Sequence, residues 1–258
     1  MINLKKLFFV VNVKSVTVTV LALISTYLCR RFNLVANFPL AIITTAVIFP
    51  IVFSIGGAYK RRENALREYG SLKAHGRAIF FAARDWPQQS DEDTKTRTIT
   101  LLGDFLKACR RLFTEPIDQM PGNEEAVYKV FSQLSSHIIS LRNDKGLASG
   151  EASRCNQYLS KMIIAFESVK HIYQYRTPRA LRLYSDIFIV VLPILYGPYF
   201  AYISKDFSRG LEYLLPILFS VVLVTLDQIQ ENLENPFDQI GEDDVVINAE
   251  KFVSRLQL

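Results

Sequence analysis

Four long apolar stretches constrain this chain more than any other feature of its sequence. The second, Phe32 to Ala58, contains no charged residue. The third, Ile187 to Ser204, and the fourth, Tyr213 to Leu226, are also uncharged, and the first, Leu7 to Cys29, is interrupted only by Lys14. A helix needs about 20 apolar residues to cross a hydrocarbon core of roughly 30 Å. The pattern therefore predicts four transmembrane helices, paired as one hairpin near each end of the chain.

The same stretches could instead form two hairpins buried inside a soluble protein. We favour the membrane interpretation because the second stretch is long enough to span alone and because the hairpins flank a polar middle. The first stretch is not expected to be a cleaved signal peptide. It has no small-x-small site followed by a polar start, and it runs into Arg30, Arg31 and the second stretch.

The polar segment between the hairpins, residues 60–183, has a helical pattern. Apolar residues recur there at spacings of three and four, which is typical of amphipathic helices. One set is Leu101, Leu102, Phe105, Ala108, Cys109 and Leu112, and a second is Val127, Val130, Phe131, Leu134, Ile138 and Leu141. These sets predict a bundle of helices with an internal core.

The distribution of Lys and Arg predicts the orientation in the membrane, because cytoplasmic flanks carry an excess of both. The start of the chain carries Lys5, Lys6 and Lys14, and the end of the second span is followed by Lys60, Arg61, Arg62 and Arg67. We therefore expect a multi-pass cell-membrane protein with both termini and residues 60–183 in the cytoplasm. This placement accounts for much of the net charge of +5 without a nucleic-acid partner.

The sequence offers little support for an enzyme. Its three histidines, His75, His137 and His171, have no metal-ligand spacing with one another or with the three cysteines. The GxSxG, Walker A and GxGxxG motifs are all missing. We expect no catalytic residues, and the apolar stretches contain no carboxylate relay, so any transport is expected to be passive.

Two motifs flank the apolar stretches. Tyr59, Arg61 and Gly70 follow the second stretch, and Asn235, Pro236 and Phe237 end the stretch Leu226 to Phe237 after the fourth. Both motifs resemble the bestrophin family of anion channels, including its bacterial members. The first keeps the spacing of the family motif after its second helix, although Arg62 and Glu63 replace its aromatic pair, and the second is similar to the Asn-Pro-Phe signature after the family's last span. The two-plus-two order of apolar stretches around a helical insert is also similar.

The resemblance implies an all-α membrane protein, with four transmembrane helices and a cytosolic helical domain per subunit, assembled as a homo-pentamer around a central pore. In this reading the second helix lines a hydrophobic neck, and the register from Tyr59 and Arg61 puts the neck at Thr45, Phe49 and Phe53. These residues are spaced i, i+4, i+8 and so share one helical face. The alternative is that both Phe side chains simply contact lipid or the protein core.

The resemblance also implies a second, cytosolic constriction just before the third span. The residues that correspond to it are Arg176, Thr177 and Arg179, of which Thr177 is the first choice for the pore-facing position. Animal members bind calcium through acidic residues after the Asn-Pro-Phe motif, and Glu242, Asp243 and Asp244 are the residues here that could do so. Their spacing departs from that pattern, so we expect no obligatory cofactor, with calcium as the only candidate.

The expected domain order is a first transmembrane hairpin (1–58), a cytosolic helical domain (59–183), a second hairpin (184–229) and a cytosolic C-terminal segment (230–258). The leading functional hypothesis is a passive channel for small anions of the chloride type, and chloride, nitrate and bicarbonate all stay open. The alternatives are a membrane-anchored interaction protein, in which the spans only anchor the insert, and a secondary transporter.

Overall fold

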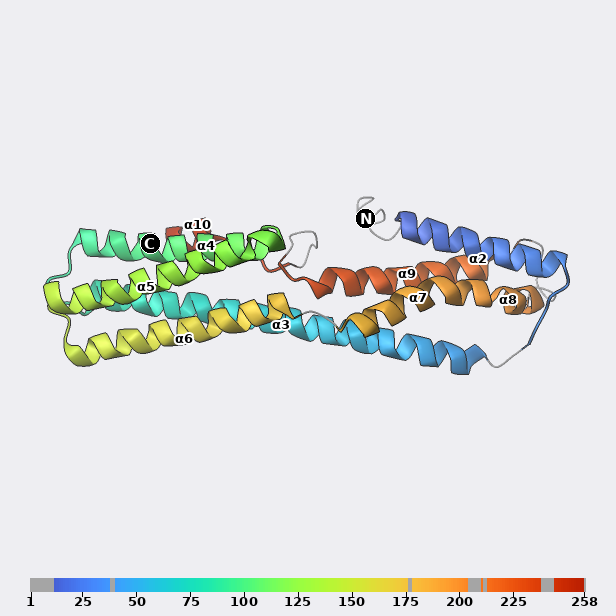
Figure 1. Cartoon of the computed structure of the whole chain (residues 1–258), viewed down its shortest axis with the longest axis horizontal. Helices are drawn as coiled ribbons and strands as arrows, with labels where there is room; N and C mark the ends of the chain where they lie inside the picture. Colours follow the sequence, from blue (N-terminus) through green and yellow to red (C-terminus); the bar gives the residue numbers. More distant parts are fainter. Residues whose placement is uncertain are drawn as a thin grey trace. The chain divides into compact units, whose positions relative to one another are not determined.

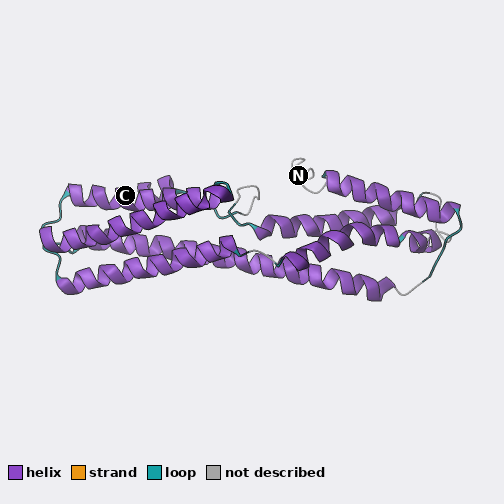
Figure 2. Ribbon diagram, in the orientation of Figure 1, coloured by secondary structure: helices purple, strands orange, loops and turns teal. Residues whose placement is uncertain are grey.

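A computed structural model describes residues 12–37, 40–175, 178–203, 210, 213–237 and 244–257. Within these ranges the chain is helical and contains no strand (Figure 1, Figure 2). The helices pack as two units: unit 1 comprises residues 1–60 and 177–234, and unit 2 comprises residues 61–176 and 235–258. Each unit is therefore assembled from two stretches that are far apart in the sequence.

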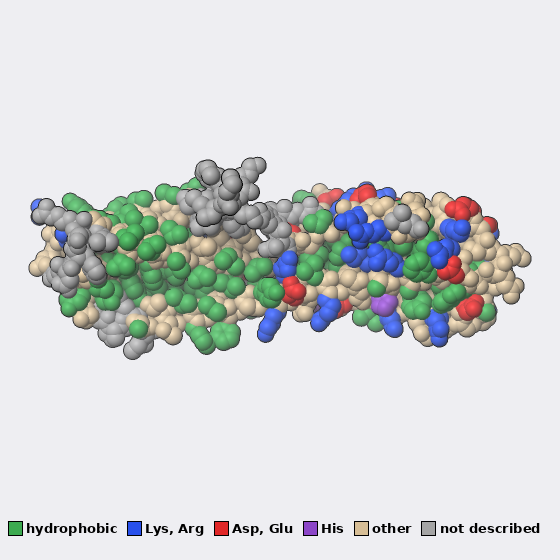
Figure 3. Space-filling view, turned by 180° about the vertical axis from the view of Figure 1, so that it is seen from behind, with side chains coloured by type: hydrophobic (Ala, Val, Ile, Leu, Met, Phe, Trp, Pro, Cys, Tyr) green, Lys and Arg blue, Asp and Glu red, His purple; other side chains and the backbone are tan. Residues whose placement is uncertain are grey.

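Unit 1 contains α2 (Val13–Arg31), the first part of α3 (Leu40–Asp85), α7 (Arg179–Leu195), α8 (Gly197–Ile203) and α9 (Leu214–Glu234). Helix α2 packs against α7, α8 and α9, and α7 packs against α9. Four segments are long and apolar enough to cross a membrane: α2, α3, the α7–α8 pair and α9. These four candidate helices coincide with the four apolar stretches, and hydrophobic side chains are widespread on the face of this unit that Figure 3 shows.

The third apolar stretch forms two helices rather than one. Helix α7 ends at Leu195, and α8 begins at Gly197, which is followed by Pro198. A β-carbon at Gly197 would lie 2.2 Å from Ser25 Oγ of α2, so only glycine fits at this approach. The Ser25 hydroxyl donates a hydrogen bond of 2.7 Å to the Ile194 carbonyl near the end of α7. The break is therefore fixed by packing against α2.

Helix α3 runs without interruption for 46 residues, although Pro50 lies inside it. Proline has no N–H, so the carbonyl of Ala46, four residues earlier, loses its helical donor. The hydroxyl of Tyr184 on α7 donates to that carbonyl at 3.1 Å. A side chain of a neighbouring helix thus replaces the missing backbone bond, which is how proline is accommodated in membrane helices.

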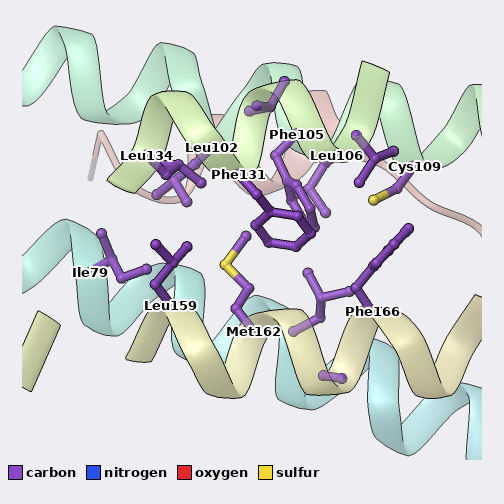
Figure 4. Close-up of a cluster of buried hydrophobic side chains, with 14 of the residues drawn as sticks. Ile79, Leu102, Phe105, Leu106, Cys109, Phe131, Leu134, Leu159, Met162 and Phe166 are labelled. Carbon is purple, nitrogen blue, oxygen red and sulfur yellow. The ribbon is translucent and has the colours of Figure 1, made fainter. Parts of the chain in front are cut away.

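Unit 2 contains the second part of α3, α4 (Glu92–Thr114), the 3-10 turn η1 (Ile117–Gln119), α5 (Met120–Asp144), α6 (Ser149–Gln174) and the short α10 (Ala249–Ser254). Figure 4 shows its core, in which Phe105, Phe131 and Phe166 meet with ring centroids 4.7 to 6.4 Å apart. The predicted second set, from Val127 to Leu141, is entirely buried. In the first set Leu102, Phe105, Cys109 and Leu112 are buried, and the periodicity predicted this core correctly.

One buried polar group in unit 2 is a histidine with a lowered pKa. His137 is 2% exposed, and its Nε2 lies 2.8 Å from Thr98 Oγ1. Because the Thr98 hydroxyl donates to the Thr94 carbonyl at 2.7 Å, His137 Nε2 carries the proton and donates to Thr98. The other nitrogen, Nδ1, is buried without a hydrogen-bond partner among the described residues. Burial, helped by the nearby charge of Arg97, lowers the His137 pKa to about 4.

Candidate functional site

The three predicted neck residues lie on an open face of α3. Thr45 is exposed, and its hydroxyl donates to the Ala41 carbonyl at 2.7 Å, so its polar group is satisfied within the helix. Phe49 and Phe53 are 60% and 63% exposed. Their rings contact each other edge to face, with centroids 4.5 Å apart and an interplanar angle of 77°. The pair forms an aromatic surface that the described part of its own subunit leaves uncovered.

The opposite face of the same helix holds unit 1 together. Val47, Ile51, Ser54 and Ala58 are buried, and Val47 and Ile51 belong to the hydrophobic core of this unit. At 100° per residue this buried face points about 170° away from the face of the predicted neck residues. The sequence therefore gives α3 two distinct faces: one packs inside the subunit, and the other is free for lipid, a second subunit or a pore.

Two further features mark the open face. From Leu40 to Tyr59 the helix contains no charged residue. Gly56 and Gly57 are exposed, and an added β-carbon at either would meet nothing within 4 Å. Glycine inside a membrane helix commonly allows another helix to approach closely. Because the described part of the chain places nothing there, these glycines leave room for the close approach of another helix.

The residues of the first sequence motif lie further along α3. Tyr59 is 53% exposed, and Arg61 is half-buried. Gly70 is exposed with open space around its missing β-carbon, whereas the preceding residue, Tyr69, is 7% exposed and lies in the core of unit 2. The motif therefore lies where α3 passes from its first to its second part.

The second motif anchors the C-terminal segment onto unit 2. The side-chain oxygen of Asn235 accepts a hydrogen bond of 3.4 Å from the Phe237 N–H, and the Pro236 carbonyl accepts one of 2.7 Å from Val245. This turn directs Phe237, 1% exposed, onto Phe113, with ring centroids 5.0 Å apart. The Asn-Pro-Phe sequence thus has a structural role here, because it fixes the entry of the chain into the core.

The remaining predicted site residues are only partly described. Arg176 and Thr177 lie outside the described residues, and Arg179 is exposed as the first residue of α7. Glu242 and Asp243 also lie outside them, and Asp244 is half-buried. Among the residues that are described, no group of three His, Cys, Asp or Glu side chains could hold a metal ion.

Sequence reasoning missed a group of charges where α2, α7 and α9 meet. Lys14 Nζ lies 2.5 Å from Asp227 Oδ2 and 3.4 Å from Asp186 Oδ1. The helices extend beyond the apolar stretches, and this extension brings both carboxylates into the bundle. A single Lys in an otherwise apolar stretch requires a partner, and that requirement was the available signal. A second group of charges follows one turn away, where Arg182 contacts Glu231 at 3.0 Å and also Glu234.

A scan against models of known protein families finds no match, and no curated protein sequence matches the chain. Solved structures do match. A variant of a bacterial bestrophin homologue from Klebsiella pneumoniae has a TM-score of 0.74 at 16% identity, covering 97% of this chain and 98% of that one. Another variant from this organism has a TM-score of 0.76 at 15% identity, with 98% of both chains covered. A third structure, described only as a membrane protein, has a TM-score of 0.76 at 14% identity over 94% of this chain and 96% of that chain.

The chain therefore has the fold of these bestrophin homologues over nearly its whole length, as the two sequence motifs predicted. At 14–16% identity the likeness establishes the fold, and the chemistry of the site must be argued from the residues of this chain. The all-helical architecture and the four candidate membrane helices agree with that fold.

Proposed function

We propose that this chain is one subunit of an oligomeric channel that conducts small anions passively across the cell membrane. The observation that carries the proposal is the uncharged open face of α3, where Phe49 and Phe53 are 60% and 63% exposed in a fold shared with bestrophin homologues. A bundle of four spans is too small to enclose a wide pore lined by one helix. Several copies are needed, arranged in closed cyclic symmetry, and five is the number implied by the family resemblance.

In this arrangement each subunit contributes Thr45, Phe49 and Phe53 to a narrow neck. An ion entering a dry constriction must exchange its hydration shell for something else, which is costly. Rings of aromatic side chains can therefore close a pore by excluding water, and a small displacement that wets the neck opens it. Thr45, with a hydroxyl, makes its end of the neck the wetter one.

The cytosolic end of the pathway would be narrowed again by Arg176, Thr177 and Arg179. Copies of Arg179, which is exposed at the start of α7, would form a ring of positive charge that attracts anions.

The proposed topology puts both termini, the cytosolic domain of 59–183 and the segment 230–258 in the cytoplasm, with 1–58 and 184–229 as the two hairpins. Accessibility labelling of Cys29, which ends its apolar stretch, from the two sides of sealed vesicles tests this orientation.

The decisive experiment is flux from the purified protein in liposomes. Under a potassium chloride gradient, the reversal potential is expected to lie toward the chloride equilibrium potential. A reversal toward the potassium potential would refute anion selectivity, and no flux at all would favour the membrane-anchored interaction protein. Particle images with cyclic symmetry around a central hole would support the assembly, and a conducting monomer would refute it.

Truncation of the neck separates pore lining from packing. If the rings close the pore, Phe49→Ala and Phe53→Ala widen and wet it, and the current per assembled channel rises. If instead they pack between helices, each truncation costs about 3–5 kcal/mol through a cavity, and assembly falls. Leu218→Ala, at a residue of α9 that is 52% exposed, is the matched control and is expected to change neither the current per channel nor the assembly. Lower current at normal yield in both Phe variants would reject the neck assignment.

A secondary transporter is the second candidate, and one observation favours it. The contacting charges of Lys14, Asp186 and Asp227 lie within candidate membrane helices, where ionisable residues often mark proton or ion pathways. A transporter would show saturable uptake driven by a pH gradient. A channel would show flux that follows the electrochemical gradient of the anion alone, so the same liposomes distinguish the two.

A further inference from the structure

Unit 2 contains a cavity of about 290 Å³ that has no place in the proposed pore. The cavity lies between the second part of α3 and the C-terminal segment around α10. Four of the residues lining it are cationic: Lys73 and Arg77 from α3, and Lys251 and Arg255 from the C-terminal segment. The others include Tyr69 and Phe252, and no carboxylate lines the cavity. Figure 3 shows Lys and Arg side chains gathered on one face of this unit.

The four cations have no counter-charge among the described residues. Lys73 Nζ lies over the ring of Tyr69 at 4.2 Å from its centroid, and the Arg77 guanidinium lies over Phe252 at 5.5 Å. None of the four side chains forms an ion pair with a described carboxylate. The acidic residue of α10, Glu250, is held by Arg110 through two hydrogen bonds of 3.0 and 3.1 Å.

The fold holds these cations together despite their mutual repulsion. Phe252 is 4% exposed, and Asn248 caps α10 by accepting a hydrogen bond of 2.7 Å from the Lys251 N–H. Gly103 of α4 admits α10 closely, since a β-carbon there would lie 3.0 Å from Val253. The backbone positions of the cations are therefore set by packing. Four like charges around one cavity produce a strongly positive potential that favours a bound anion.

We propose that this cavity is a binding site for a compact phosphate-bearing polyanion. Arg guanidinium groups bind phosphate through two parallel hydrogen bonds, and Lys binds it as a mobile point charge, so two of each suit more than one phosphate group. The volume is at the small end for ligand sites, which favours a diphosphate or triphosphate group over a larger molecule. Tyr69 and Phe252 are buried beneath cations, so the cavity offers no open ring on which a base could stack.

The phosphate groups could belong to a soluble molecule or to a lipid headgroup. Lys73 lies twelve residues beyond Arg61 along α3, which at 1.5 Å per residue is roughly 18 Å along the helix. This distance from the proposed membrane boundary favours a soluble ligand. The experiment therefore contains one arm for each source.

The test is titration of the full-length protein in detergent with inorganic pyrophosphate, followed by calorimetry. Lys73→Gln combined with Arg255→Gln removes one cation from each side of the cavity and is expected to raise the dissociation constant about tenfold or more, because charge-assisted hydrogen bonds are lost. Arg142→Gln with Arg154→Gln removes the same amount of charge from exposed sites. This control is expected to change the dissociation constant less than about twofold, as screening of distant charges predicts. Lys73→Arg with Arg255→Lys keeps both charges and should retain binding.

Equal weakening in both charge-removing variants would overturn the proposal, since it would show a nonspecific effect of net charge. The lipid arm uses vesicles of phosphatidylcholine with or without a phosphatidylinositol phosphate. Binding only to the phosphoinositide vesicles, lost in the Lys73→Gln, Arg255→Gln variant, assigns the site to a lipid headgroup. No binding of either probe by the wild-type protein overturns the proposal, whatever the protein conducts.

Discussion

The contact of Lys14 with Asp227 gives a prediction in which two single substitutions of one ion pair have very different costs. The Asp227 side chain is only 8% exposed, whereas those of Lys14 and Asp186 are 36% and 42% exposed. Lys14→Met removes the only cation that contacts Asp227 among the described residues. Leaving a buried charge without its partner typically costs about 3–5 kcal/mol, and we expect that loss in the free energy of unfolding.

Substitution of the other partner, Asp227, should destabilise the protein much less. In Asp227→Asn, Lys14 keeps Asp186 at 3.4 Å and is partly exposed, so we expect a loss of about 1 kcal/mol, the scale of an exposed ion pair. Replacing both partners, with Lys14→Met and Asp227→Leu, removes the charges together. Apolar replacement of a buried pair is often neutral, so the double variant should lie within about 1 kcal/mol of the wild type.

The assay is denaturant unfolding of the full chain in detergent, with size-exclusion chromatography to confirm that each variant is assembled. With Asp227→Leu as the second single variant, Lys14→Met and the double variant form a double-mutant cycle, and a coupling energy of about 2 kcal/mol or more is expected for groups in contact. The reasoning is refuted if Lys14→Met is no less stable than Asp227→Asn, or if the double variant is no more stable than Lys14→Met. Either result would mean that Asp227 carries no unpaired buried charge once Lys14 is replaced, because it is hydrated or protonated.

Three further predictions concern single residues. The His137 pKa is lowered to about 4 from an unfolded value near 6.5, so the free energy of unfolding should be at its full value above about pH 6.5 and fall by about 3 kcal/mol as the pH drops toward 4. In His137→Gln, unfolding measured over the same pH range should show a smaller loss. Phe237→Ala should cost about 3–5 kcal/mol and expose the C-terminal segment to protease, whereas equal protease resistance would contradict its anchoring role. Tyr184→Phe leaves the Ala46 carbonyl without its donor, so the thermal midpoint should fall by the equivalent of about 1–2 kcal/mol; an unchanged midpoint would show that the bond contributes nothing.

The sequence predicted the parts of the fold that depend on local pattern. Apolar stretches indicate spans because length and hydropathy alone decide them, and a period of 3.6 residues indicates the buried face from Val127 to Leu141. The continuity of α3 across residue 60 was not apparent, since the composition changes from apolar to charged there while the helix continues. The break after Tyr196 was also missed, because it depends on Ser25, far away in the sequence.

The candidate site could also be predicted only in part. The shared face of Thr45, Phe49 and Phe53 follows from helical spacing, and the structure leaves that face open. The partners of Lys14 could not be read from the chain, because Asp186 and Asp227 are brought to it only by the packing of three helices. The same holds for the cationic cavity, whose two halves come from α3 and the C-terminal segment.

Because each unit is assembled from two distant stretches of the chain, its packing cannot be completed until the second stretch has been translated. Lys14 and Asp227 are 213 residues apart, and α2 packs mainly against helices that are translated last. At roughly 5–20 residues per second, the ribosome needs about 10–40 s to supply that partner after Lys14 has been made. During this interval Lys14 lacks Asp227, so the packing of unit 1 can be completed only after α9 has been translated.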